Sequence, residues 1–314
     1  MLKGTKVVFV VWIISSFNIL FAKSLNYLKL KSLRYQHYFE DHSGGSTRVK
    51  VNSSKRVFEL IEALETEELS RISNEIDKAY NEPYRSTVNI NQVIKHNKMI
   101  YGVDIYNSTV AELINPVFPE IEIFNIRSNS FWISKYIKHK NLILRPKLSF
   151  TQRWFIDEKY TLQDIINNNV DIKFQDTVPV DFAYFDLKVE SSQSDVDFYF
   201  ELIGLEITNN DRYKYYETLI GYKKNISKLI NLGGTISPIF YGNYNVFETL
   251  SVDLRIIASR NTKLDFKLSQ LVRKLTFKTD WKNLNLSLGF ESLRVSIFNN
   301  TYSSNIFMNI IINY

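Results

Sequence analysis

The sequence contains no cysteine in its 314 residues. A secreted scaffold held by disulfides is therefore excluded, as is a lipid-modified cysteine next to an export signal. No segment after residue 22 is long and apolar enough for a transmembrane helix, which excludes a helical membrane protein. The sequence also lacks a run rich in lysine and arginine, and its formal charge of +6 is spread along the chain. Nucleic acid is therefore not expected as a partner.

The first residues have the layout of an export signal. Lys3 and Lys6 precede an apolar run over 7–21, and the small residue Ala22 follows that run. We expect a signal peptide over 1–22 that is cleaved after Ala22. The alternative is an uncleaved anchor, but polar residues interrupt the run and leave it barely long enough to span a bilayer.

One strong amphipathic helix is predicted over about 54–80. Apolar residues recur there at spacings of three and four, with acidic residues between them. Ser53 or Ser54 can cap its start, and Pro83 ends it. We expect this helix to pack on a β surface or to fill part of a cavity. A weaker helical pattern covers 157–167.

Most of the remaining sequence alternates between apolar and polar residues, which is the period of a half-buried strand. In one such run, Leu284, Leu286, Leu288 and Phe290 are separated by polar residues or glycine. No helix fits between the runs, so neighbouring strands should pair antiparallel as hairpins. The predicted strands after residue 178 cover about 178–190, 195–208, 212–224, 226–238, 247–258, 262–270, 273–281, 283–290, 293–298 and 304–314.

Alternation alone does not say whether the apolar face of each strand meets a protein core or lipid. In a soluble sandwich, the apolar faces of two sheets pack together. The export signal, the absence of cysteine, the scarcity of glycine and proline (10 and 6 residues) and the succession of hairpins favour a barrel, in which closure removes the sheet edges. The predicted fold class is all-β: an antiparallel up-and-down transmembrane β-barrel of about 12–14 strands over 98–314. A helical N-terminal segment over 23–97 precedes it.

The last predicted strand has apolar residues at every second position and ends on an aromatic ring, which suits a membrane interface. Its residues on this face are Ile306, Met308, Ile310, Ile312 and Tyr314. The strand resembles the C-terminal signature by which the outer-membrane assembly machinery recognises β-barrel proteins of Gram-negative bacteria, where Phe is the usual last residue and Tyr a variant. A helical segment before such a barrel is also similar to the long-chain fatty-acid transporter superfamily and its conjugal-transfer relatives. These resemblances imply a bacterial outer-membrane location, with membrane lipids and the barrel-assembly machinery as partners.

If the apolar faces meet lipid, the polar faces line the lumen, and basic residues outnumber acidic ones there. The acidic residues of these faces are Asp253, Asp265 and Asp280. An excess of cations would raise the local concentration of anions or carboxylate-headed ligands. The alternative is a solvated wall in which these charges pair or face water. The candidate lumen cations are Arg145, Lys147, Arg153, Arg255, Lys263, Lys267, Lys274, Lys278 and Arg294.

No pattern in the sequence points to catalysis. The four histidines, His37, His42, His96 and His139, all precede the clearest strands, and no metal-ligand spacing, nucleophile motif or phosphate-binding glycine loop is present. We therefore expect no enzyme activity, cofactor or bound metal. The predicted function is that of a passive channel or transporter for small solutes or amphiphiles, with a small anionic or amphiphilic solute as a partner. The alternatives are a surface barrel that serves as adhesin or scaffold without transport, and a soluble exported β-protein.

Overall fold

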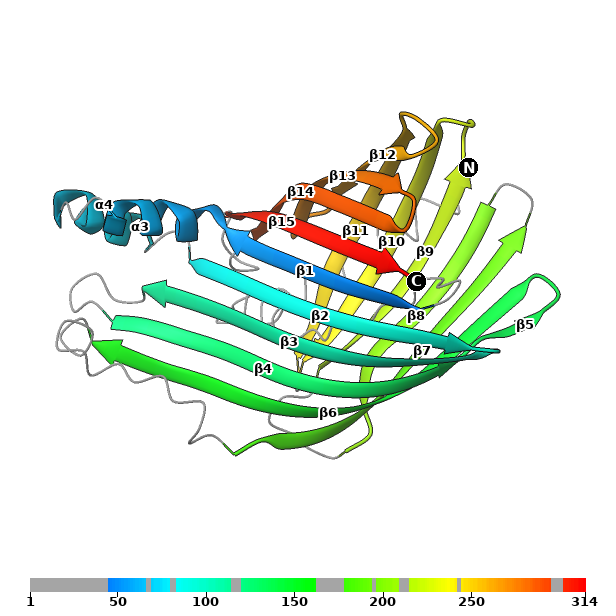
Figure 1. Cartoon of the computed structure of the whole chain (residues 1–314), viewed down its shortest axis with the longest axis horizontal. Helices are drawn as coiled ribbons and strands as arrows, with labels where there is room; N and C mark the ends of the chain where they lie inside the picture. The colour runs from blue at the N-terminus through cyan, green and yellow to red at the C-terminus, as the bar shows by residue number, and fades with distance from the viewer. Residues whose placement is uncertain are drawn as a thin grey trace, which may run out of the picture.

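The computed structural model describes residues 45–65, 69–79, 83–113, 120–161, 178–193, 196–208, 215–241, 244–294 and 302–314. Within these residues one antiparallel sheet forms the wall of a barrel (Figure 1). The predicted signal peptide over 1–22 lies outside the described residues. The strands of the wall are β1 (Ser46–Ser54), β2 (Tyr84–His96), β3 (Met99–Leu113), β4 (Glu120–Lys135), β5 (Ile137–His139), β6 (Leu142–Thr161), β7 (Val180–Gln193), β8 (Val196–Glu206), β9 (Tyr215–Asn225), β10 (Ile230–Tyr241), β11 (Tyr244–Ile257), β12 (Thr262–Leu268), β13 (Val272–Trp281), β14 (Leu284–Arg294) and β15 (Tyr302–Asn313).

The sheet closes on itself, so the wall has no open edge among the described strands. Each strand pairs with its sequence neighbour, and β1 pairs with β15 from Ser46↔Asn313 to Ser54↔Asn305. The short strand β5 continues β4 and pairs with β6, as β4 does, so the described strands make a wall fourteen strands wide. Closure satisfies the backbone hydrogen-bonding groups that hydrocarbon cannot satisfy. The predicted all-β, antiparallel up-and-down barrel is confirmed.

The two ends of the barrel differ in their connections. Two-residue turns at 97–98, 140–141 and 282–283 join strands at the end where Gly45 and Tyr314 lie. The first residue of each turn has a positive φ, which tight hairpins require. We call this the short-turn end. At the opposite end, called the long-loop end, most connections between neighbouring strands are longer, as over 162–179 and 207–214, while those over 242–243 and 269–271 are short.

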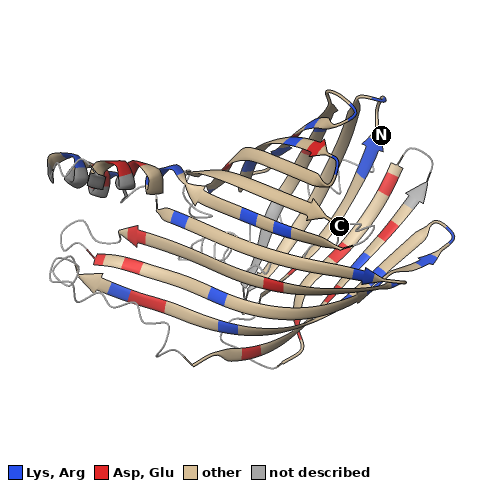
Figure 2. Ribbon diagram, in the orientation of Figure 1, with Lys and Arg blue, Asp and Glu red and all other residues tan. Residues whose placement is uncertain are grey.

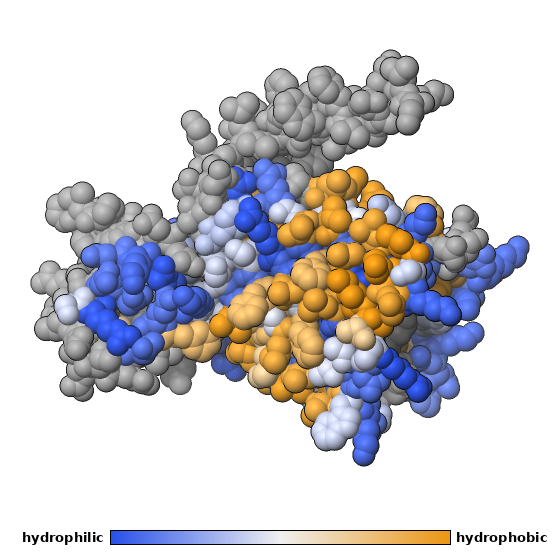
Figure 3. All heavy atoms as spheres, turned by 90° about the horizontal axis from the view of Figure 1, so that it is seen from above, coloured by the Kyte–Doolittle hydropathy of each residue, from blue (hydrophilic) through white to orange (hydrophobic). Residues whose placement is uncertain are grey.

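The outward positions of the wall are mostly apolar, as the alternation predicts for a barrel in lipid. On β15, Ile306 is 42% exposed, whereas Asn305 and Phe307 on either side are 2% and 3% exposed. Figure 3 shows an apolar expanse on the outer surface between hydrophilic regions. Because the apolar residues lie on the outside of one closed sheet, they cannot pack between two sheets. The alternative of a soluble sandwich is therefore excluded.

The predicted helix over 54–80 is instead two helices, α3 (Lys55–Glu65) and α4 (Leu69–Ala79), placed between β1 and β2. The wall therefore includes 46–54 and 84–96, which the sequence assigned to a segment before the barrel. The Oγ of Ser54 accepts a hydrogen bond from the backbone N–H of Arg85 at 3.0 Å, which ties the start of α3 to β2. The weaker helical pattern over 157–167 is also corrected, because its first five residues belong to β6.

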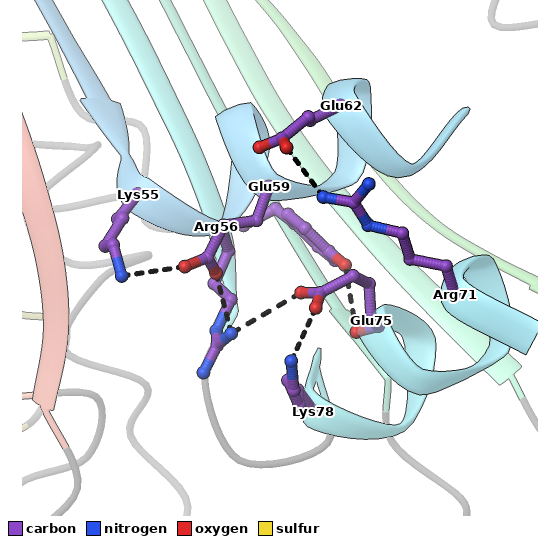
Figure 4. A network of polar contacts seen from close by, with 8 residues as sticks. Lys55, Arg56, Glu59, Glu62, Arg71, Glu75 and Lys78 are labelled. Carbon is purple, nitrogen blue, oxygen red and sulfur yellow. Dashed lines mark hydrogen bonds and ion pairs between the residues drawn. The ribbon is translucent and has the colours of Figure 1, made fainter. Parts of the chain in front are cut away.

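The helices extend from the long-loop end and do not fill the lumen (Figure 1). Charged side chains join them to each other (Figure 4). Arg56 of α3 lies 3.5 Å from Glu75 of α4, and Arg71 of α4 lies 2.6 Å from Glu62 of α3. Neither described helix is long and apolar enough to cross a membrane.

Acid is expected to loosen the first helix through Glu59. The hydrogen bond from Lys55 and the charge of Arg56 hold the pKa of the Glu59 carboxyl below its ordinary value of 4.5. A depressed pKa in the folded state means that the stabilisation is present above pH 4.5 and is lost as the pH falls through the lower, folded value. Amide hydrogen exchange over 55–65, corrected for the intrinsic rate, should therefore accelerate at low pH. In Glu59→Gln this acceleration should be smaller, and equal acceleration in both proteins would contradict the assignment.

Candidate functional site

The lumen at the long-loop end is filled by an apolar cluster. Its residues come from strands on opposite sides of the barrel, so they meet across the lumen and not along one sheet surface. We call these residues the apolar cluster: Tyr106, Val110, Phe124, Ile126, Tyr215, Ile239, Leu271, Val272 and Leu293. All are less than 5% exposed. Apolar side chains of this kind exclude water from one level of the lumen.

A buried charge network lies on the side of the lumen formed by β2, β3, β4, β6 and β7. Lys147 is 2% exposed, and its charge interacts with the carboxylates of Asp186 and Asp104, which are 0% and 1% exposed. Its Nζ also lies 4.3 Å from the centre of the Trp132 ring, a favourable cation–π position. We call these four residues the buried lysine network. A buried charge is tolerated only with such partners.

Backbone and side-chain donors orient the two carboxylates of this network. The side-chain amide of Asn91 donates to Asp104, and the backbone N–H of Gly204 donates to Asp186 at 2.6 Å. Gly204 has a φ of +71°, and the pairing of β7 with β8 is irregular between Phe185 and Leu187. The irregularity surrounds Asp186, so a bulge in the wall presents a backbone donor to a buried carboxylate.

A cavity of about 570 Å³ occupies the lumen on the side formed by β8 to β15 and β1. Asn225 and Asn231, which flank the 226–229 turn, contribute to its lining, so it reaches toward the short-turn end. Seven of its lining residues are basic and three are acidic. We call it the basic cavity, and its charged residues are Arg48, Lys50, Lys223, Arg255, Lys267, Lys274, Lys278, Asp197, Asp253 and Asp265. Figure 2 shows basic residues as bands along these strands.

Few acidic side chains form ion pairs with the cations of the basic cavity. Asp265 accepts two hydrogen bonds from Arg255, at 2.6 and 3.0 Å, and also lies 2.8 Å from Lys278. Lys267 and Lys274 are direct partners across β12 and β13, a placement of like charges that destabilises a sheet. Glu291 lies 3.7 Å from Lys274 and partly compensates it. The lining residues themselves have a formal charge of +4, from seven basic and three acidic side chains.

An aromatic ring forms part of the cavity wall. Phe307 is 3% exposed, and the Nζ of Lys274 lies 4.1 Å from the centre of its ring. The ring packs on Gly289, where an added Cβ would lie 2.7 Å from the Phe307 Cζ and would clash with the Leu275 carbonyl. Glycine is needed at 289 for this close approach.

The sequence-predicted lumen cations are not gathered at one place. Arg255, Lys267, Lys274 and Lys278 line the basic cavity. Lys263 forms an ion pair with Asp280 at 3.2 Å. The other four, Arg145, Lys147, Arg153 and Arg294, are buried elsewhere at 2–7% exposure.

Aromatic rings surround two of these buried cations. The guanidinium of Arg153 lies 5.0 Å from the ring of Tyr184 and 5.7 Å from that of Phe182. Arg145 lies 5.2 Å from the ring of Tyr136 and 3.3 Å from Glu190. These contacts hold the two side chains against the wall, so they serve packing more than solute binding.

Sequence reasoning missed three cations of the basic cavity, namely Arg48, Lys50 and Lys223. Arg48 and Lys50 alternate with Thr47, Val49 and Val51, which is the pattern used to predict the later strands. The alternation that marks a strand was therefore present in β1. Because a strong helical pattern follows it, the prediction placed 23–97 in a separate segment before the barrel.

The histidines, which the sequence offered as possible catalytic residues, do not gather in the lumen among the described residues. His96 and His139 are exposed at the short-turn end, and His37 and His42 lie outside the described residues. In the part of the chain that the structure describes, no three acidic, histidine or cysteine side chains are grouped so as to hold a metal ion.

No protein-family model matches the chain, and no curated protein matches it by sequence. Solved structures do match it. The deltaS2S3 mutant of the monoaromatic hydrocarbon channel TodX has a TM-score of 0.53, over 88% of this chain and 91% of that chain at 6% identity. The fold is that of the outer-membrane β-barrel seen in these structures. The toluene transporter TbuX of Ralstonia pickettii gives a TM-score of 0.51 over 86% of this chain and 90% of its own, also at 6% identity.

A third channel of this fold is CymD, a monoaromatic hydrocarbon channel, with a TM-score of 0.50 over 87% of this chain and 89% of its own at 6% identity. Identity this low establishes the fold and carries no solute from those channels to this one. The outer-membrane location predicted from the sequence agrees with this fold and with the apolar outer face of the wall.

Proposed function

We propose that the barrel is a passive conduit for small amphiphilic solutes with an anionic head group. The observation that carries this proposal is the basic cavity, a lumen space of about 570 Å³ with a net lining charge of four. Pockets that hold small ligands have volumes of roughly 300–1,000 Å³. A lumen lined by charge of one sign concentrates solutes of the opposite sign.

The two levels of the lumen suit the two parts of such a solute. The apolar cluster at the long-loop end offers contacts for a hydrocarbon part, and the basic cavity toward the short-turn end offers cations for a carboxylate or sulfonate. TodX, TbuX and CymD are described as channels or transporters of monoaromatic hydrocarbons or toluene. The fold therefore accommodates the passage of small apolar compounds, and the cations here add a preference for a negative head group.

A second function, that of a surface barrel without transport, is favoured by the apolar cluster itself. Its side chains fill the lumen at one level, as a static core would. A solute passes only if this cluster rearranges. Transport measurements separate the two functions because a static core blocks every solute, whatever its charge.

Uptake into proteoliposomes tests the proposal. Benzenesulfonate and phenyltrimethylammonium are similar in size, have opposite charges and cross protein-free bilayers poorly. We expect the purified chain to admit benzenesulfonate several-fold faster than phenyltrimethylammonium. Entry of both probes at the protein-free rate would support the surface barrel, and faster entry of the cation would contradict the assigned head group.

The assembly role of the last strand stays a prediction. Ile306, Met308, Ile310, Ile312 and Tyr314 all lie on its outward face. Tyr314 also joins the seam of the barrel, because it exchanges two backbone hydrogen bonds with Gly45, at 3.0 and 3.1 Å. We infer that recognition by the barrel-assembly machinery uses this outward face, which is accessible before insertion.

A further inference from the structure

A groove of about 410 Å³ lies on the outer surface of the wall near the long-loop end. It runs over β12, β13, β14 and β15 and reaches the start of α3. Its floor is mostly apolar, and its charged lining residues are Lys55, Arg273, Lys274 and Glu291. Lys274 and Glu291 pair with each other at 3.7 Å. We call it the outer groove, and its lining residues used below are Lys55, Arg273, Leu275, Phe290, Ser292, Ser304 and Ile306.

The register of the strands divides the outer groove into a polar row and an apolar row. Arg273 pairs with Ser292, and Ser292 pairs with Ser304, so these three residues lie side by side. The pairing of Ser54 with Asn305 places Lys55, the next residue, beside Ser304. The polar row thus has a cation at each end and two hydroxyl groups between them.

The apolar row lies two residues further from the long-loop end. Leu275 pairs with Phe290, and Phe290 pairs with Ile306. Phe290 is 63% exposed and Ile306 42%. A sharp change from hydroxyl and basic groups to exposed hydrocarbon marks the height at which lipid head groups meet acyl chains.

Neighbouring side chains hold the two cations at this height. The guanidinium of Arg273 lies 4.5 Å from the ring centre of Tyr302, whose hydroxyl donates to the Gln270 carbonyl at 3.1 Å. Lys55 is 66% exposed, and its Nζ lies 2.8 Å from Glu59. Three strand spacings separate the two cations, a distance of roughly 14 Å.

We propose that the outer groove binds a lipid that carries two phosphate groups on its head. The acyl chains lie over Leu275, Phe290 and Ile306, one phosphate binds Arg273, and the second binds Lys55. A single-phosphate head is too short to reach both cations, whereas a disaccharide phosphorylated at both ends is long enough. The groove faces the outer leaflet, because barrels of this class have short turns on the periplasmic side and longer loops outside.

Native mass spectrometry of the delipidated full chain in detergent tests this site. We expect bis-phosphorylated lipid A to bind more tightly than monophosphorylated lipid A, and phosphatidylethanolamine to bind weakly. Arg273→Gln and Lys55→Gln should each weaken binding of the bis-phosphorylated lipid by roughly twofold to fivefold, as exposed charge pairs do. The double variant with both substitutions should lose more affinity for bis-phosphorylated lipid A than for monophosphorylated lipid A.

Matched controls separate the site from general charge effects. Lys228→Gln removes an exposed cation at the short-turn end and should leave binding unchanged. Arg273→Lys keeps the charge and should retain most of the affinity. Each variant is first checked for a compact barrel by its gel mobility before boiling. Unchanged binding in the double variant, an equal loss in Lys228→Gln, or displacement of the lipid by inorganic phosphate would overturn the proposal.

Discussion

Replacing Lys223 and Lys267 with glutamate is expected to abolish the anion preference of the barrel. Both residues line the basic cavity, where seven cations face three carboxylates. The double variant has five of each, so the net lining charge falls from four to zero. In a planar bilayer with a potassium chloride gradient, we expect the reversal potential to move from a value displaced toward the chloride equilibrium potential to a value near zero. The effect should be largest at low salt, where screening is weakest.

A charge-matched control tests whether the cavity or the overall charge sets the preference. Lys228→Glu with Lys282→Glu changes the net charge of the protein equally, but at exposed turns of the short-turn end. This control should keep most of the anion preference. An unchanged reversal potential in the Lys223 and Lys267 variant would support the alternative of a solvated wall, in which the lumen charges face water and do not act on the solute.

The late strands could be predicted from the sequence because one face of each strand meets lipid and the other meets the lumen, which makes apolar and polar residues alternate. The pattern over 262–270 became β12 (Thr262–Leu268), and that over 304–314 became β15 (Tyr302–Asn313). Of the pattern over 293–298, the first two residues belong to the end of β14, and 295–298 lies outside the described residues. Alternation marks the faces of a strand but not its ends, which depend on the partner strand.

The helical pattern was wrong over 157–161 because these residues lie near the long-loop end of the barrel wall. Asp157, Glu158 and Lys159 are exposed near the end of β6, where that strand still pairs with β4 up to Glu120↔Thr161. Above the apolar belt, outward positions meet water, so charge there does not interrupt the strand. Sequence alternation is lost at this height, and the remaining spacing of apolar residues mimics a helix.

The candidate site could be predicted only in part. Alternation assigned Arg255, Lys267 and Lys278 to the inward face, but it could not say which inward cations border an open cavity and which are buried. That distinction depends on what meets across the lumen. Lys147 is buried because β3, β4 and β7 bring Asp104, Trp132 and Asp186 to it. Contacts between strands far apart in the sequence leave no periodic signal in any one of them.

Lys147→Met is expected to lower the free energy of unfolding by about 3–5 kcal/mol, the cost of leaving buried charges without their partner. Asp186 and Asp104 are 0% and 1% exposed, so water cannot replace the lost ammonium without rearrangement. Methionine is similar in length to lysine, so the free-energy cost of an unfilled space at position 147 is small. Urea unfolding in detergent micelles, followed by tryptophan fluorescence, measures the change, since Trp132 lies against Lys147.

Two further variants distinguish lost charge pairing from lost packing. Lys147→Met combined with Asp186→Asn removes one of the uncompensated charges and should regain part of the lost stability. Lys98→Met, at an exposed turn, should change the free energy of unfolding by less than about 0.5 kcal/mol. If Lys147→Met itself cost less than about 1 kcal/mol, the carboxylates would have to be hydrated in the folded barrel. Water would then reach the lumen beside Trp132, and the basic cavity would have a second aqueous path.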